Sequence, residues 1–86
     1  MVLSELLTPT LVKAARALLG YDQAMLAAKT GISKKTLGLI ETMDAVPMDA
    51  RRVRVLQELR TRMEDELGVE FVFAGPGTGE GVRLRR

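Results

Sequence analysis

The sequence predicts a mainly α-helical domain in which four short helices are followed by a β-hairpin. Capping residues and glycines divide residues 8–68 into four stretches, each with apolar residues at the spacing of an amphipathic helix. After Gly68 the spacing changes to alternation, as in "VEFVF" and "GVRLR", which is typical of strands with one covered face. We therefore expect one domain, with residues 1–68 forming the helical part and residues 69–86 a hairpin extension.

The first helix is expected over "TPTLVKAARALLG". Thr8 is a suitable N-cap, Pro9 fits the first helical position, and Gly20 ends the stretch. The inward stripe at helical spacing should comprise Leu11, Ala14, Ala15 and Leu18. This pattern places Leu18 in the core.

The second helix is expected over "DQAMLAAKTG", where Asp22 caps the start and Gly31 ends it. Leu26 and Ala27 should face inward. A small side chain at Ala27 lets the next helix cross closely, and Gly31 supplies the positive φ that turns the chain between the two helices. This spacing describes a helix-turn-helix.

The third helix should begin at Ser33 and run to about Met43, with Leu37 and Ile40 as its buried pair. A loop, "DAVPMD", follows it. A fourth helix is predicted from Met48 or Asp49 to about Leu67, and its inward stripe should comprise Val53, Leu56, Leu59 or Arg60, Met63 and Leu67. The expected core of the whole domain includes Leu18, Leu26, Ala27, Leu37, Ile40, Leu56 and Phe71.

Composition excludes several classes of function. The 86 residues include no cysteine and no histidine, so we expect no disulfide, no metal site and no cofactor. Without these side chains no nucleophile–base pair can be built, and we expect no enzyme activity. No apolar run approaches the roughly 18 residues of a membrane span, and a cytoplasmic protein is expected. The formal charge is +2, but residues 1–50 are neutral overall, with five basic and five acidic residues.

The stretch "TPTLVKAARALLGYDQAMLAAKTGISKKTLGLIE" resembles the phage-repressor and Cro-like helix-turn-helix family of XRE type, in particular its short bacterial members. The resemblance implies a lambda-repressor-like fold in which the helix beginning at Gln23 braces the DNA backbone and the next helix enters the major groove. Gln23 matches the phosphate-contacting glutamine of the family, and Arg16 and Glu41 match an ion pair between the first and third helices. The residues matching or continuing the DNA-facing surface are Ser33, Lys34, Lys35, Thr36, Gly38 and Leu39.

The departures from the family pattern lie on the surface that should bind DNA. Asp22 replaces a serine or asparagine and places a negative charge where a phosphate should sit. Leu39 replaces a polar or basic residue, and its side chain makes no hydrogen bond to a base edge, although it can pack on a thymine methyl. Gly38 costs the helix about 1 kcal/mol relative to alanine.

Two functional hypotheses therefore stay open. The first is a small transcriptional regulator that binds operator DNA through residues 33–43. The second is an antiactivator that uses the same surface to block a transcription activator protein, with Leu39, Gly38 and Met25 forming an apolar patch rimmed by Lys34 and Lys35. In this respect the chain resembles antiactivators of the QseM kind, which are associated with mobile-element transfer.

A homodimer is a further expectation. "VEFVF" has two alternating faces, and the fourth helix need cover only one of them. Val72 on the other face, together with an unpaired strand edge, predicts a tendency to pair with a second chain.

Overall fold

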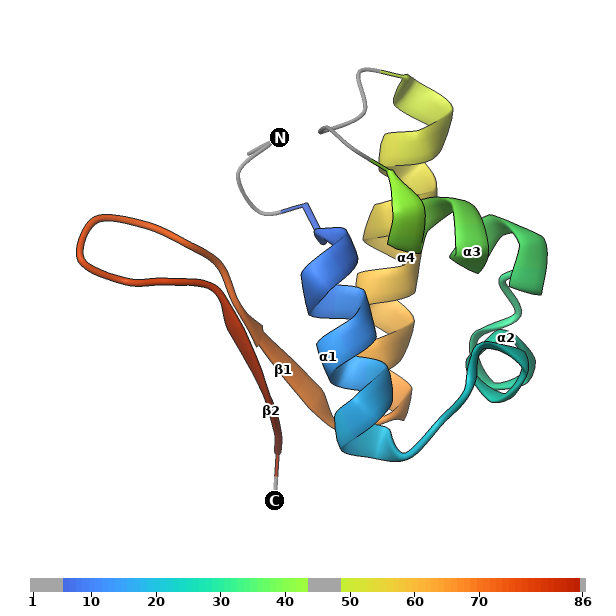
Figure 1. The fold of residues 1–86 in the computed structure, drawn as a ribbon, viewed down its shortest axis with the longest axis horizontal. Helices are drawn as coiled ribbons and strands as arrows, with labels where there is room; N and C mark the ends of the chain where they lie inside the picture. Colours follow the sequence, from blue (N-terminus) through green and yellow to red (C-terminus); the bar gives the residue numbers. More distant parts are fainter. Residues whose placement is uncertain (1–5, 44–48, 86) are drawn as a thin grey trace.

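A computed structural model describes residues 6–43 and 49–85 of the chain. The elements, in chain order, are α1 (Pro9–Leu19), α2 (Gln23–Thr30), α3 (Lys34–Thr42), α4 (Ala50–Glu66), β1 (Val69–Val72) and β2 (Gly81–Leu84) (Figure 1). The predicted fold class, a helix-turn-helix domain closed by a C-terminal hairpin, is confirmed. Most of the loop predicted over "DAVPMD" lies outside the described residues.

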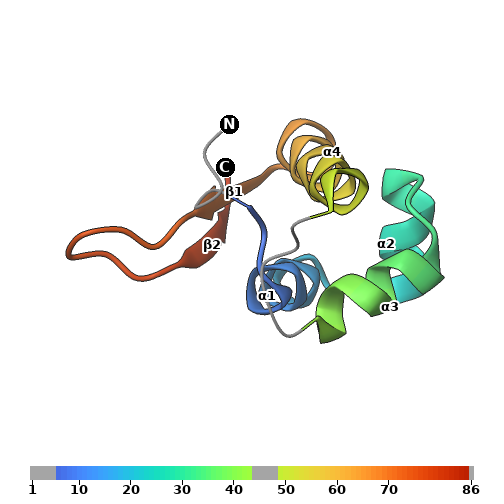
Figure 2. The same ribbon diagram turned by 90° about the horizontal axis from the view of Figure 1, so that it is seen from above.

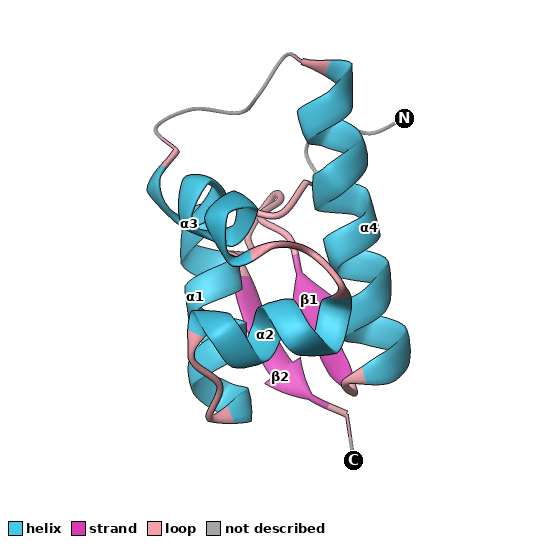
Figure 3. Cartoon of the chain, turned by 90° about the vertical axis from the view of Figure 1, so that its right-hand side faces the viewer, coloured by secondary structure: helices cyan, strands magenta, loops and turns pink. Residues whose placement is uncertain are grey.

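The elements form three layers. α1 and α4 lie in the middle, α2 and α3 lie on one side of them, and the hairpin lies on the other (Figures 1 and 2). Figure 3 looks onto the α2–α3 side and shows the hairpin behind the helices. The helix-turn-helix surface and the hairpin therefore face in opposite directions, and each is accessible without the other.

The caps that define the helices are those expected from the sequence. The side chains of Thr8, Asp22 and Ser33 each accept a hydrogen bond from a backbone N–H of the first turn that follows, at 3.2, 2.7 and 3.1 Å. This arrangement satisfies an N–H that has no partner within the helix. Gly20 and Gly31 end α1 and α2 in the left-handed conformation, with φ of +73° and +77°.

The core differs from expectation at α1. Leu18 was predicted to be buried but is 46% exposed, whereas Val12 is fully buried. α1 packs against α3 on one side and against β2 on another, so its buried stripe is turned toward Val12, Ala15 and the half-buried Leu19. Leu18 lies at the margin of this stripe, in the last turn. The other predicted core positions are buried, except that Ala27 is half-buried and packs against the core.

The hairpin covers the outer side of α1 and α4. Val69 pairs with Leu84, and Phe71 pairs with Val82, in antiparallel register. All four side chains contribute to or pack against the core. The next pair, Glu70 and Arg83, lies on the outer face and forms an ion pair at 2.7 Å. The alternation read from the sequence thus corresponds to one covered and one exposed face.

Candidate nucleic-acid interface

The turn between α2 and α3 is fixed by a glycine and a buried hydroxyl. The N–H of Gly31 donates to the carbonyl of Ala27 at 2.9 Å, which closes α2. The Thr30 side chain is buried; its hydroxyl donates to the carbonyl of Leu26 at 2.8 Å and accepts from the N–H of Ile32 at 3.3 Å. The Thr30 hydroxyl and the Ile32 N–H are therefore both hydrogen-bonded within the protein, and these bonds fix the angle between α2 and α3.

An ion pair between Arg16 and Glu41, the two residues that match the ion pair of the family, holds α3 against α1. Two nitrogens of the Arg16 guanidinium donate to the two carboxylate oxygens of Glu41 at 2.8 and 2.9 Å, and a third donates to the carbonyl of Tyr21 at 3.1 Å. Glu41 is only 4% exposed. This bidentate arrangement is geometrically specific, so it sets the position of α3 on the domain.

The ionisation of Glu41 follows from these contacts. Burial acts to raise the pKa of the Glu41 carboxyl, but hydrogen bonds from Arg16 and Gln23, with the positive charges of Arg16 and Lys13, outweigh it and hold the pKa below its ordinary value. The side chain of Gln23, the residue expected to brace DNA at the start of α2, lies close to α3 at Gly38.

The outward surface of α3 is formed by Lys35, Leu39 and Thr42, which are spaced at i, i+4 and i+7 opposite the buried Leu37 and Ile40. All three outward residues are exposed, and Leu39 is 49% exposed. Lys34 is exposed beside them. Within residues 6–43 and 49–85, neither lysine takes part in an ion pair.

A family model described as helix-turn-helix matches residues 12–65, which is well over half of the chain. The chain belongs to the XRE-type helix-turn-helix family. This is a family of DNA-binding regulators and not of enzymes. No curated protein and no solved structure matches the chain.

The match runs from α1 nearly to the end of α4, so it overlaps all four helices of the described residues, and the hairpin lies beyond the matched segment. In the part of the chain that the structure describes, no helix is long and apolar enough to cross a membrane. In that same part, no three potential ligands among carboxylate, imidazole and thiol side chains are grouped to hold a metal ion.

Some of the sequence-predicted site residues have internal partners in this helix-turn-helix domain. The Ser33 hydroxyl accepts from the N–H of Thr36 and also donates to the Thr36 hydroxyl at 2.9 Å. Gln23 is half-buried and lowers the pKa of Glu41. Gln23, Ser33 and Thr36 thus lie at the starts of α2 and α3. Lys34, Lys35 and Leu39 are exposed on the surface of α3.

Sequence reasoning missed a second group of cations. Arg51 and Arg52, in the first turn of α4, line a hollow of about 150 Å³ together with Thr36 of α3 and with Asp49, the N-cap of α4. Positive charge in the first turn opposes the helix dipole, and neither arginine forms an ion pair within the described segments. The run "RRVR" at a helix start was the available signal, but only the fold places it beside α3.

Gly38 offers a test of how closely a ligand approaches α3. A Cβ added at this position would have its nearest neighbour, Oε1 of Gln23, at 3.9 Å, which is an ordinary contact. Because alanine favours the helix, Gly38→Ala should raise the free energy of unfolding by about 0.5–1 kcal/mol in chemical denaturation. A destabilised variant would contradict this description of the site. If Gly38→Ala raises the free energy of unfolding but weakens ligand binding, the ligand contacts the α3 backbone at Gly38.

Proposed function

We propose that this helix-turn-helix protein is a transcriptional regulator that binds operator DNA by placing α3 in the major groove. One observation carries the proposal. Lys34 and Lys35 belong to the first turn of α3, and Arg51 and Arg52 of α4 share a hollow with Thr36 of that turn and with Asp49. None of these four cations has an ion-pair partner among the described residues. Phosphates are the partners that such a group suits, because each neutralised phosphate releases bound counterions.

The side chains divide into two roles under this proposal. Lys35 reaches a base edge or phosphate from the outward surface of α3, and Leu39 packs on a thymine methyl. Lys34, Arg51, Arg52 and the start of α2 at Gln23 contact phosphates and fix the register, and they carry no sequence information themselves. Ser33 and Thr36 fix the first turn of α3 by their hydrogen bonds to each other. Their hydroxyl groups also hydrogen-bond to phosphates of the operator backbone.

A second candidate function has its own supporting observation. Met25 on α2 and Leu39 on α3 are 44% and 49% exposed, and they are two of three large apolar side chains that the described part of the chain leaves exposed. Exposed apolar side chains beside lysines suit the acidic-rimmed groove of another protein. An antiactivator that blocks a transcription activator would use Leu39 as its central contact.

The experiment that separates the two functions compares Lys35→Ala with Leu39→Arg. For DNA binding, Lys35→Ala should weaken operator affinity and reduce the salt slope by roughly one contact, while Leu39→Arg keeps or raises general affinity. For protein binding, Leu39→Arg should cost about 2 kcal/mol or more, and Lys35→Ala should mainly slow association. Both variants are measured by DNA titration and by regulation of a reporter in cells.

Both positions are exposed, so each variant should keep the circular dichroism and melting of the parent, which serves as the folding control. If Lys35→Ala abolishes regulation and Leu39→Arg leaves it intact, the antiactivator function is wrong. Loss of regulation in Leu39→Arg alone, with DNA binding unchanged, would contradict the operator-binding function.

A further inference from the structure

The outer edge of β2 carries backbone groups that the hairpin leaves unpaired. The N–H of Arg85 donates to the carbonyl of Gly68 at 2.7 Å, so in this antiparallel ladder Arg83 and Arg85 direct their backbone groups toward β1. The N–H and C=O groups of Val82 and Leu84 therefore point away from β1. Within the described residues the sheet has only two strands, and nothing pairs with this edge. It is a template for another extended segment.

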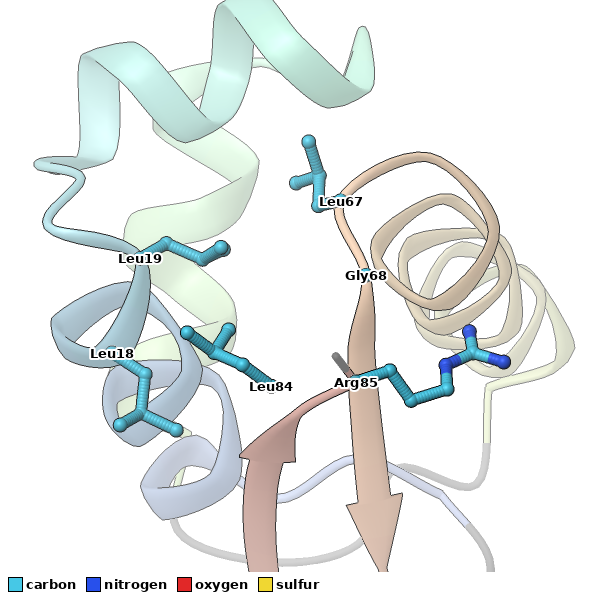
Figure 4. A pocket seen from close by; sticks show the side chains of 6 residues that line it. All are labelled: Leu18, Leu19, Leu67, Gly68, Leu84 and Arg85. Carbon is cyan, nitrogen blue, oxygen red and sulfur yellow. The ribbon is translucent and has the colours of Figure 1, made fainter.

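An apolar groove lies between this edge and α1. Its volume is about 490 Å³, and its walls include Gly81 and Val82 of β2 with Thr10, Ala14 and Leu18, which recur every four residues along one side of α1. Leu18 is 46% exposed and also lines a second groove, of about 460 Å³, at the other end of β2 (Figure 4). A strand added beside β2 would direct alternate side chains into these hollows.

A second copy of the chain does not fit this edge through its own β2. α1 packs over β2, and antiparallel pairing about a two-fold axis would keep the α1 helices of both copies on the same face of the sheet. The two helices would lie about 5 Å apart, one strand spacing, whereas packed helices need about 8–10 Å. A parallel copy would align Glu80 with Glu80 and Arg85 with Arg85. The edge suits a strand that has no helix above it.

We propose that this surface binds an extended segment of a partner protein, which joins the sheet as a third strand antiparallel to β2. The two residues of the segment opposite Val82 and Leu84 form hydrogen-bonded pairs with them and direct apolar side chains toward α1. Because the hairpin and α3 face in opposite directions, the partner leaves the helix-turn-helix surface uncovered (Figure 2). The proposal goes beyond the proposed function and does not depend on it.

Charge defines the segment further. Glu80 precedes β2, and Arg85 follows it. Arg83 is already paired with Glu70 at 2.7 Å, whereas the guanidinium of Arg85 donates to the backbone carbonyl of Glu64 and forms no ion pair within the described segments. An antiparallel segment that complements these charges carries a carboxylate near its amino end, opposite Arg85, and a cation near its carboxyl end, opposite Glu80.

The test uses the synthetic peptide acetyl-Glu-Val-Ser-Val-Ser-Lys-amide, whose side chains follow this pattern. It is titrated into the full chain without DNA and followed by NMR. Binding should saturate with a dissociation constant of about 1 mM or tighter. It should shift the amide signals of Val82 and Leu84 and slow their hydrogen exchange, while the signals of Lys35 and Leu39 on α3 stay in place.

The matched control peptide has both valines N-methylated. It keeps every side chain but lacks the two N–H groups that would face β2, so it should bind at least about 10-fold more weakly. Ala14→Leu fills the groove and should weaken binding of the unmodified peptide about 10-fold. Ala28→Leu, an exposed position on α2, is the control variant and should bind as the parent does.

Circular dichroism and melting check that each variant is folded, and where Ala14→Leu fails to fold, the two peptides alone decide. The proposal is overturned if the unmodified peptide shows no saturable binding, if the N-methylated peptide binds equally, or if a folded Ala14→Leu binds as the parent does. A dimer in sedimentation equilibrium that Val82→Pro abolishes would also overturn it, because a second copy would then occupy the edge.

Discussion

Replacing Arg16 with alanine should destabilise the domain by about 3 kcal/mol, because it leaves the buried Glu41 carboxylate without its charged partner. The loss should lie at the lower end of the range for buried ion pairs, because the Arg16 side chain is 23% exposed. Urea denaturation at neutral pH measures the effect. Arg16→Ala combined with Glu41→Gln should recover part of the loss, because no uncompensated charge then remains.

The same ion pair gives a pH dependence. The pKa of Glu41 is lowered in the folded protein, so its contribution to stability is fully present above the ordinary carboxyl pKa and is lost as the pH falls through the folded value. The parent should therefore lose stability below about pH 4, and Glu41→Gln should show a flatter acid limb. An Arg16→Ala variant as stable as the parent at every pH would contradict a structural role for the pair.

Replacing Ala27 with leucine should destabilise the domain by about 1–3 kcal/mol, since Ala27 packs against the core where α2 crosses α3. The extra methylene groups would force the two helices apart. Ala28→Leu is the matched control, because Ala28 is the next residue along and is exposed. Thermal melting of both variants checks the prediction. Equal melting of Ala27→Leu and the parent would mean that the crossing is not as close as the structure has it.

The boundaries of the helices could be predicted from the sequence because they depend on local chemistry. Thr8, Asp22 and Ser33 each cap the helix that follows, and each bond closes within three residues. The exposure of Leu18 could not be predicted in the same way. Helical spacing gives the stripe, but the part of the stripe that is covered depends on where α3 and β2 pack against α1.

In the candidate site, too, features that depend on local sequence could be predicted, and features that depend on tertiary contacts could not. The exposure of Lys35 follows from its position opposite the buried pair of α3, and Lys34 is exposed as the first residue of the helix. Arg51 and Arg52 were missed because their place beside Thr36 is a tertiary contact. Thr30 was missed because a polar residue in an amphipathic pattern is ordinarily assigned to solvent, whereas here both its hydrogen bonds are made inside the turn.

The measurement that tests the central claim most directly is a titration of DNA with the purified protein at several salt concentrations. If α3 and the four cations around its start bind operator DNA, log K should fall linearly with log salt, with a slope of roughly −3 to −4 per bound chain. A folded variant with Lys34, Lys35, Arg51 and Arg52 replaced by alanine should lose most of that slope. Affinity no tighter than about 10⁻⁴–10⁻⁶ M on every duplex, or a slope that the fourfold variant leaves unchanged, would contradict the claim.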